Sequence, residues 1–483
     1  MNDLSPTSPP LWRALALVAP LQARVSGMLP AAVTGISIDS RSLAPGDLFF
    51  AIRGDNSDGH DYVTKAFAAG AAVAVVDEAH ADALRASGPL LVVHHVQGAL
   101  ERLGIAARQR SKGRIAAITG SVGKTSSKEA LALMLRQAGA THAAVASFNN
   151  HWGVPLTLAR MPEASRYGVF EIGMSHAGEI TPLVAMVRPH IALVTNVGPV
   201  HLEHFASVDD IARAKGEIFS GLVPGGAAVI NRDIPQFEML AAMARQSPAR
   251  HIMSFGRDPG AEAQLVDAEV REGSTYVKAR VLGQNLEFRI GAAGVHFAQN
   301  ALGLLLAARA MGLELGKAAA ALAEFGAPKG RGETSTLYLA QGQASLIDES
   351  YNANPASMRA ALAVLAAAKP STQTGRRIAV LGDMLELGDQ SMALHRALGD
   401  DIEQLGIDQV FTVGPLMAGL HESLPQSRRA ASALASLDMI ALLRDNVHAG
   451  DVIMVKGSNG SKMGLIVTAL REAFANRASA EEI

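Results

Sequence analysis

The sequence predicts an α/β protein of three domains, and three observations support that architecture. The chain has 483 residues, and at roughly 150 residues per domain this length predicts three folding units. Hydrophobic residues make up 49% of the chain and charged residues 18%, which supplies several packed cores and excludes a disordered or highly charged scaffold. Strand patterns alternate with helical patterns in two long regions, which favours parallel sheets covered by helices.

Charge and cysteine content exclude several classes of function. Lys and Arg total 43 and Asp and Glu total 45, so the net charge of −2 gives no overall attraction to nucleic acid. Aromatic residues are 4% and cysteine is absent, which excludes a base-stacking platform, disulfides, cysteine metal sites and thiol nucleophiles. The apolar runs reach about half of the ~20 residues that a membrane span needs. We therefore expect a monomeric, cytoplasmic chain with no membrane segment and no nucleic-acid partner.

Residues 1–98 are expected to form a small α/β N-terminal domain. The segment 48–52 has the pattern of a strand and is followed by a long polar loop over 53–59. A helix is predicted over 61–69 and a buried strand over 72–76. This module ends before the motif-rich part of the chain.

Residues 99–327 are expected to form a central parallel-sheet domain. A helix is predicted over 99–110, then a strand over 114–118, a glycine-rich loop and a helix over 126–138. Strands over 168–171 and 191–195 each lead into a polar turn. Between 264 and 290 the pattern changes to a period of two, and it returns to a helix over 296–311.

Residues 328–483 are expected to form a second doubly wound module with a Rossmann-like order of elements. Four strands are predicted, over 345–348, 378–381, 409–413 and 452–455, with helices that include 355–368 and 463–475. None of these strands leads into the GxGxxG pattern of dinucleotide binding.

The clearest local motif is Ile-Thr-Gly-Ser-Val-Gly-Lys-Thr at 118–125. A strand, a glycine turn, Lys-Thr and a helix follow in the order that surrounds phosphate with backbone N–H groups, so the central domain is predicted to be a P-loop-type ATPase. A full Walker loop has glycine where this chain has Ile118, and the alternative is a glycine turn with an incidental lysine. The predicted nucleotide-binding residues are Gly120, Ser121, Val122, Gly123, Lys124, Thr125 and Ser126.

A second glycine-lysine stretch, at 456–462, also follows a predicted strand. It lacks the Gly-Lys-Thr ending of the first motif. A tight strand–helix turn with a polar lining explains it better than a second triphosphate site.

Polar side chains after two neighbouring strands indicate a metal site beside the phosphate loop. Glu171 ends one strand and His201 follows the next, and ligands collect at the carboxyl ends of parallel strands. Taken alone, Glu171 reads equally as a solvated strand end and His201 as part of a polar turn. Lys215 lies in an apolar helical stripe with Ile211 and Ile218, behind a capping box that begins at Ser207. From spacing alone, snorkelling of Lys215 to solvent is the simpler interpretation.

Taken together, these segments resemble the Mur ligase family of ATP-dependent amide-forming enzymes in bacterial cell-wall precursor synthesis. The resemblance rests on 119–125, Asn149-Asn150, 171–173, 196–201 and 214–217. It also includes Asn300, similar to the family's adenine-side asparagine, and Arg331, similar to its linker arginine. The phosphate loop with Ile118 is the family's own form, and the resemblance covers nearly the whole chain.

Two further segments narrow the resemblance to one branch of the family. Ile-Asp-Glu-Ser-Tyr-Asn-Ala-Asn-Pro at 347–355 and the stretch 380–388 resemble the branch that adds D-alanyl-D-alanine to UDP-N-acetylmuramoyl-tripeptide. The Asp-Asn-Pro-Arg tetrapeptide of the diaminopimelate-adding relative is absent. Glu349 stands where this branch often has Asp. Lysine and diaminopimelate both remain open as the third residue of the tripeptide.

The resemblance implies a mechanism, two cofactors and further site residues. ATP would convert the tripeptide carboxylate to an acyl phosphate, which the amine of D-alanyl-D-alanine then attacks. Lys124, Lys215 and His201 would be catalytic, and Mg²⁺ would be held by Thr125, Glu171, His201 and a carbamylated Lys215. ATP contacts would extend to Asn300, Arg331, Asp348 and Tyr351, and the other substrates would meet Ser40, Arg41, Asn149, Asn150 and Asn354.

Other functions that use the same loop remain open from the sequence. Folylpolyglutamate synthase shares the ATP chemistry, although about 118 residues precede the phosphate loop here, room for a domain that this enzyme lacks. A diaminopimelate- or lysine-adding ligase of the same family is a second alternative. A nucleotide-switched binding protein is a third, and it would hydrolyse ATP without either ligase substrate.

Overall fold

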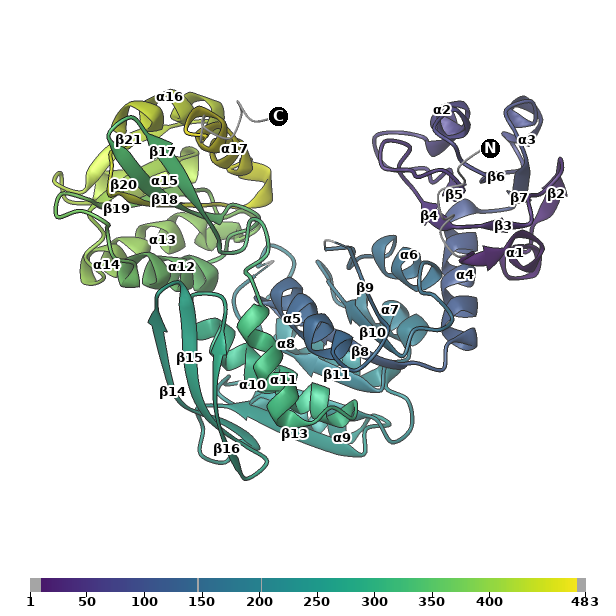
Figure 1. Cartoon of the computed structure of the whole chain (residues 1–483), viewed down its shortest axis with the longest axis horizontal. Helices are drawn as coiled ribbons and strands as arrows, with labels where there is room; N and C mark the ends of the chain where they lie inside the picture. The colour runs from purple at the N-terminus through teal and green to yellow at the C-terminus, as the bar shows by residue number, and fades with distance from the viewer. Residues whose placement is uncertain (1–9, 146, 201, 476–483) are drawn as a thin grey trace, which may run out of the picture.

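The computed structural model describes residues 10–475 except residues 146 and 201, and it contains one large sheet in each of three modules. Figure 1 shows the central module at the base, with the N-terminal and C-terminal modules raised on opposite sides of it. The α/β class and its parallel-rich sheets are as predicted. No helix within the described residues is long and apolar enough to span a bilayer.

The N-terminal module is built on a five-stranded sheet that is parallel except at one edge. Its apolar strands are buried on both faces, as parallel strands require. The predicted helix over 61–69 begins with a 3₁₀ turn, Gly59–Tyr62, before it becomes α-helical. In spatial order the strands are β2 (Arg24–Ser26), β7 (Leu90–Val93), β6 (Val73–Asp77), β5 (Asp47–Phe50) and β4 (Gly35–Ser37), and the helices are α1 (Ala14–Leu21), α2 (Val63–Ala68) and α3 (Ala81–Leu84).

Helix α4 (Val96–Arg110) joins the N-terminal module to the central one. Its apolar residues Leu100 and Leu103 belong to the N-terminal core, together with Leu156 of helix α6 (Gly153–Ala159). Two short strands, β1 (Trp12–Arg13) and β3 (Ala32–Val33), pair beside α1. The predicted boundary after residue 98 therefore falls inside a continuous helix, and two modules share one core.

The central module has a nine-stranded sheet whose parallel part carries the phosphate loop (Figure 1). The period-two segment forms the antiparallel hairpins at one end of this sheet, as its alternation predicts. In spatial order the strands are β16 (Gln284–Ile290), β15 (Ser274–Val281), β14 (Ala263–Arg271), β13 (His251–Gly256), β12 (Ala227–Asn231), β11 (Ile191–Val194), β8 (Arg114–Thr119), β10 (Tyr167–Glu171) and β9 (Thr141–Ala143).

Helices cover both faces of this sheet and bury two separate cores. The helices that flank the phosphate loop are α5 (Lys124–Arg136) and α10 (Val295–Ala310), and α7 (Ile180–Val187) lies beside α4. The remaining helices are α8 (Val208–Gly216), α9 (Phe237–Arg245) and α11 (Leu315–Ala321).

The C-terminal module is a six-stranded doubly wound sheet, as predicted, with one antiparallel edge strand. That edge strand, β17 (Glu333–Leu339), was not predicted, and neither was β21 (Arg429–Ala433) at the other edge. The order is β17, β18 (Gly342–Glu349), β22 (Val452–Lys456), β19 (Arg377–Gly382), β20 (Gln409–Val413) and β21. Its helices are α12 (Pro355–Ala367), α13 (Ser391–Arg396), α14 (Leu398–Gln404), α15 (Pro415–Ser423), α16 (Ser436–Asn446) and α17 (Gly464–Ala473).

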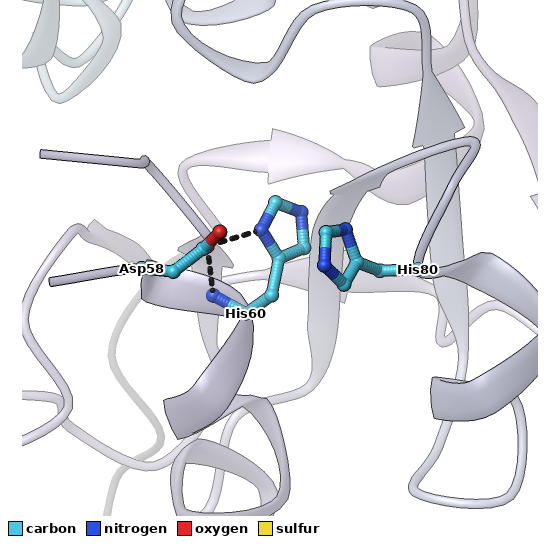
Figure 2. Close-up of side chains that lie close together, drawn as sticks. All are labelled: Asp58, His60 and His80. Atoms are coloured by element: carbon cyan, nitrogen blue, oxygen red, sulfur yellow. Dashed lines mark hydrogen bonds and ion pairs between the residues drawn. The ribbon is translucent and has the colours of Figure 1, made fainter.

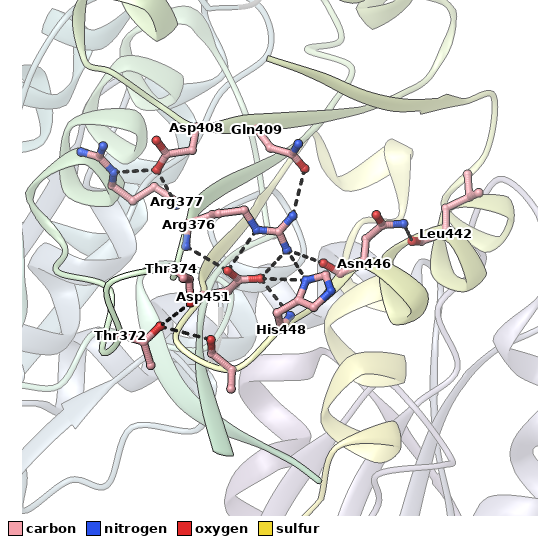
Figure 3. Close-up of polar contacts among 11 residues, drawn as sticks. Thr372, Thr374, Arg376, Arg377, Asp408, Gln409, Leu442, Asn446, His448 and Asp451 are labelled. Atoms are coloured by element: carbon pink, nitrogen blue, oxygen red, sulfur yellow. Dashed lines mark hydrogen bonds and ion pairs between the residues drawn. The ribbon is translucent and has the colours of Figure 1, made fainter. Parts of the chain in front are cut away.

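A polar cluster ties together the segments that lead into β19 and β22 (Figure 3). The Asp451 carboxylate is fully buried and accepts hydrogen bonds from the Arg376 backbone N–H at 2.9 Å and from Arg376 Nη2 at 2.7 Å. The backbone N–H of His448 donates to the same carboxylate at 2.9 Å. Each oxygen of this buried charge therefore has donors from the protein itself.

Candidate active site

The phosphate loop has the geometry that the motif predicts. It runs from the end of β8 to the start of α5, and Gly123 caps that helix with a φ of +84°. A Cβ on Gly123 would lie 2.5 Å from the Asn300 amide nitrogen, and one on Gly120 would lie 2.0 Å from Thr195 Oγ1. Glycine is favoured at both positions because their positive φ values of +84° and +150° strain any residue with a side chain, and a Cβ would crowd the neighbouring element. The loop thus packs directly against α10 and against the end of β11.

Hydrogen bonds hold this loop to the strand next to it. Thr195 Oγ1 donates to the Val122 carbonyl at 2.7 Å, and the Ser121 backbone N–H donates to the Asn196 carbonyl at 3.0 Å. Ser121 Oγ also exchanges hydrogen bonds with the backbone of Gly198. Ser126 Oγ turns back to the Gly123 carbonyl at 3.3 Å. The loop is therefore held in shape without a ligand.

Lys124 lies folded over the phosphate loop. Its Nζ donates to the Gly120 carbonyl at 2.6 Å, so the ammonium sits over the space that the loop encloses. Burial lowers the pKa of Lys124, an effect that the Glu171 carboxylate opposes and the Arg331 guanidinium reinforces. A cation held at this place is suited to neutralising phosphate oxygens.

Glu171 ends β10 beside the loop and is 1% exposed, so the solvated interpretation of this residue was wrong. Its Oε1 accepts a hydrogen bond from the Asn149 side-chain amide at 2.7 Å. Its Oε2 is buried and has no hydrogen-bond partner within the described residues. A buried carboxylate oxygen left without a donor is costly unless a cation binds there.

Lys215 is buried near the end of α8, with 2% of its surface exposed, so it does not snorkel to solvent. Ser207 is the N-cap of α8, with its Oγ accepting from the Asp210 N–H at 3.1 Å, which is one half of the predicted capping box. The helix ends at Gly216 and a 3₁₀ turn, Glu217–Gly221, follows. Desolvation lowers the pKa of Lys215 well below its usual range, and the charge on Lys124 lowers it further. Among the described residues, no hydrogen-bond acceptor contacts Lys215 Nζ.

Arg331 reaches the site from the linker that precedes β17. Its guanidinium stacks on the Tyr351 ring at 4.2 Å from the centroid, and its Nη2 donates to Ser147 Oγ at 3.3 Å. Ser147 Oγ is also 3.1 Å from Thr125 Oγ1. This chain of contacts joins the first turn of α5 to the C-terminal module. Ser147 was missed by the sequence reasoning because it lies in an irregular loop without a recognisable motif.

A cleft of about 700 Å³ lies over these residues, between the central and C-terminal modules. The phosphate loop, Glu171 and Arg331 line it, together with Asn149, Asn150, Tyr351 and Asn354. Three further lining residues, His296, Glu349 and Lys456, were not predicted as site residues. Lys456 Nζ donates to Glu349 Oε2 at 3.1 Å, so the second glycine-lysine stretch begins with an ion pair and then passes through a 3₁₀ turn, Asn459–Ser461, into α17.

A second cavity of about 230 Å³ adjoins the phosphate loop on the side of α10. Asn300 and Val122 line it, and so do Asn196, Asn231 and His296. The Asn196 Oδ1 atom is buried without a partner among the described residues. The two cavities together form a polar site on both sides of the phosphate loop.

Some predicted residues lie elsewhere or serve the fold. Asn150 Oδ1 accepts from two backbone N–H groups at the start of α6, and Asn354 forms the capping box of α12 with Ser357. The Asp348 carboxylate binds the Gly330 N–H at 3.2 Å and the Ser350 hydroxyl at 2.6 Å, which positions the linker that carries Arg331. His201 lies outside the described residues.

The predicted pair Ser40 and Arg41 lies in the N-terminal module, outside the residues that line the cleft. Arg41 is largely exposed, and its guanidinium pairs with Asp39 at 2.7 Å. In Figure 1 this module stands on the opposite side of the central sheet from the C-terminal module. The structure therefore separates these two residues from the phosphate loop.

A group of possible metal ligands in the N-terminal module, Asp58, His60 and His80, is a hydrogen-bonded brace (Figure 2). His60 Nδ1 donates to Asp58 at 2.6 Å, and its Nε2 accepts from the Asp77 N–H at 3.1 Å, so both ring nitrogens are occupied. The His60 and His80 rings stack with centroids 4.0 Å apart. Ring lone pairs lie in the ring planes, so two stacked rings cannot both point at one ion.

Three family models match the chain. The Mur ligase middle domain matches residues 118–308, the Mur ligase glutamate ligase domain matches 331–459, and the Mur ligase family catalytic domain matches 32–111. The first contains the phosphate loop and Glu171, and the second begins at Arg331. The family's domains thus fall on the residues that the cleft brings together.

Named relatives are similar over most of their length. The UDP-N-acetylmuramoyl-tripeptide–D-alanyl-D-alanine ligase of Escherichia coli (strain K12) is 34% identical over 90% of this chain and 93% of its own. A crystal structure of MurF from Acinetobacter baumannii has a TM-score of 0.82 at 30% identity, covering 96% of this chain and 99% of that one. A second structure from that organism is the UDP-N-acetylmuramoylalanyl-D-glutamyl-2,6-diaminopimelate–D-alanyl-D-alanyl ligase. It is 30% identical and has a TM-score of 0.81, covering 96% of this chain and 100% of that one. With the phosphate loop, the buried glutamate and the linker arginine in one cleft, the chain belongs to the Mur ligase family.

Proposed function

We propose that the chain joins D-alanyl-D-alanine to UDP-N-acetylmuramoyl-tripeptide at the expense of ATP, in peptidoglycan precursor synthesis. The observation that carries the proposal is the cleft itself. It places a preformed phosphate loop and a buried, unsatisfied carboxylate opposite the Arg331 side of the C-terminal module. The similarity to relatives of that name, over about nine-tenths of the chain, supports the choice of substrates.

The residues of the cleft match the two steps of this reaction. In the first step, a carboxylate oxygen of the tripeptide attacks the γ-phosphorus of ATP, the bond to the β-phosphate oxygen breaks and ADP leaves. Lys124 and the N–H groups at the start of α5 would hold the negative charge on the transferred group. In the second step, the dipeptide amine attacks the acyl carbon, phosphate leaves, and the amine loses a proton to form the amide.

The residues present also fit a bound Mg²⁺. Glu171 Oε2 has no partner among the described residues, and the Thr125 hydroxyl lies 3.1 Å from the Ser147 hydroxyl. Oxygen ligands of this kind are those that Mg²⁺ prefers, and it would neutralise charge between the phosphates of ATP. We propose Thr125, Glu171, His201 and the carbamate of Lys215 as its protein-side ligands.

Lys215 is the most informative residue for this assignment. It is buried without an acceptor among the described residues, and a carbamate would convert it to an anion that a cation stabilises. We expect Lys215→Ala to lower kcat about a hundredfold or more and short carboxylates such as acetate to restore part of it. Ligation rates of wild type and variant, with and without acetate, test this. Undiminished activity of the variant contradicts the assignment.

Product analysis tests the function as a whole. Purified chain with ATP and Mg²⁺ is expected to release phosphate only when UDP-tripeptide and D-alanyl-D-alanine are both present, with the UDP-pentapeptide identified by mass. Phosphate release without either substrate would instead indicate a nucleotide-switched protein. Ligation of glutamate to a folate, or of a single amino acid to a UDP-dipeptide, would identify one of the other ligases.

A further inference from the structure

One wall of the cleft is largely apolar and carries two carboxylates. Helix α4 contributes Ile105, which is 39% exposed, and helix α7 contributes Leu183 and Met186. Glu101 lines the same cavity. It precedes Ile105 by four residues, so both side chains lie on one face of α4. The wall thus combines an aliphatic surface with acidic groups.

The Glu101 carboxylate is oriented by its neighbours but is not neutralised. Trp152 Nε1 donates to Gln97 Oε1 at 3.3 Å, which turns the Gln97 amide so that its nitrogen donates to Glu101 Oε1 at 3.2 Å. In the part of the chain that the structure describes, no lysine, arginine or histidine forms an ion pair with Glu101. Oε2 of Glu101 thus keeps its capacity to accept a hydrogen bond from a cation.

The other carboxylate on this wall is occupied. Glu179 accepts a hydrogen bond from the Ser175 N–H at 2.7 Å and contacts His176 Nδ1 at 3.1 Å. These contacts hold the loop that leads from β10 to α7. Glu101 is therefore the acidic group of this wall that is available to a ligand.

The proposed UDP-tripeptide substrate contains one group that fits this wall, the side chain of its third residue. In a UDP-muramoyl peptide of alanine, glutamate and a dibasic third residue, the diphosphate and the glutamate carboxylate are anionic and would be repelled by Glu101. The side chain of lysine is an aliphatic stem that ends in an ammonium, and that of diaminopimelate is an aliphatic stem whose last carbon carries both an ammonium and a carboxylate. Such side chains lay their stems on apolar surface and place their charge on an acceptor.

We propose that the α4–α7 wall binds the side chain of the tripeptide's third residue and that Glu101 binds its terminal ammonium. This inference rests on the proposed function and adds a specificity-determining residue to it. The reacting carboxylate belongs to that same third residue, and the wall and the phosphate loop line one continuous cavity. Recognition of the side chain would therefore also orient the carboxylate toward Lys124.

Steady-state kinetics with three UDP-tripeptides test the proposal. Their third residue is lysine, diaminopimelate or norleucine, and norleucine keeps the aliphatic stem but lacks the amine. Wild type is expected to have a KM about tenfold higher for norleucine than for the preferred amine-bearing peptide. Glu101→Gln is expected to remove that difference by raising the KM for the amine-bearing peptide, with kcat and the KM for norleucine little changed. Whichever amine-bearing peptide has the lower wild-type KM identifies the natural third residue.

A matched carboxylate elsewhere controls for nonspecific effects of lost charge. Glu163 is exposed in the loop that precedes β10 and lines a different groove, so Glu163→Gln is expected to keep the wild-type preference. An unchanged preference in Glu101→Gln, or equal loss with all three peptides, overturns the inference while ligation itself continues. Failure of wild type to ligate any of the three overturns the proposed function instead.

Discussion

Two regions of the molecule bury charge in opposite ways. Around Asp451 the protein supplies the donors itself, from Arg376 and from backbone N–H groups (Figure 3). Around Glu171 one buried oxygen lacks a donor among the described residues, and the charge on Lys124 helps to lower the pKa of Lys215. The first arrangement is complete without a ligand and stabilises the fold. The second is complete only when anions and a cation enter, which is how a binding site differs from a structural cluster.

The largest effect on activity is expected when Lys124 is removed, and this variant tests whether the site around Glu171 serves binding and not stability. Lys124→Met is expected to lower kcat/KM for ligation about a thousandfold, because the phosphoryl group loses its nearest cation. The melting temperature should stay equal or rise, because a desolvated ammonium is removed from the cleft. Coupled phosphate release and thermal unfolding measure the two effects, with exposed Lys112→Met as the control. A large fall in melting temperature would show that Lys124 stabilises the fold, as the cluster around Asp451 does.

The opposite result is expected at Asp451. Asp451→Ala leaves the Arg376 guanidinium without its partner and should lower the free energy of unfolding by about 3 kcal/mol. At a temperature where the variant is folded, kcat/KM should stay within about twofold of wild type. Urea unfolding and the ligation assay measure both quantities. Asp401→Ala, which breaks the exposed pair with Arg359, is the matched control and should cost about 1 kcal/mol or less.

The smallest of these effects is expected at His190, whose ring can accept its hydrogen bond only when it is neutral. His190 Nδ1 accepts from the Ile115 N–H at 3.0 Å, and desolvation, with Arg108 and Arg114 nearby, lowers the pKa of His190 to about 4. Between that value and about 6.5 the unfolded chain binds a proton that the folded chain excludes, so stability falls as pH falls through this window.

The expected size of this effect is about 2 kcal/mol between pH 7 and pH 5. Urea unfolding at both pH values should show that extra loss in wild type and its absence in His190→Asn, whose carbonyl can accept the same N–H. Equal pH dependence in the two proteins would mean that other groups set the acid limit of stability.

The parts of the fold that could be predicted are those encoded by local pattern. The buried strands of the central and C-terminal sheets are short apolar runs, and the hairpins over 263–290 alternate with a period of two. Strand β17 was missed because it is an edge strand with Thr, Ser and Thr at three consecutive positions, 334–336, and its pairing with β18 decides its conformation. The predicted apolar stripe with Ile211 and Ile218 is buried in one core, although the α-helix ends at Gly216 and a 3₁₀ turn carries Ile218.

The site residues also divide into those that the local sequence predicts and those that it does not. The phosphate loop could be predicted because its chemistry is contained in eight consecutive residues, and Glu171 because it ends a neighbouring strand. Ser147, Lys456 and Glu101 could not be predicted, because they meet the cleft only after three modules pack together. The burial of Lys215 could not be predicted either, because its spacing along the helix is also compatible with an ammonium that reaches solvent.

The shared helix α4 has a consequence for synthesis of the chain. The core of the N-terminal module includes Leu100 and Leu103 of α4 and Leu156 and Ala159 of α6, far beyond its last strand at Val93. A ribosome adding 5–20 residues per second needs roughly 3 to 13 s to pass from that strand to the end of α6. The N-terminal module therefore cannot complete its core when its last strand has been made, and its exposed apolar face must wait for α6 of the neighbouring module.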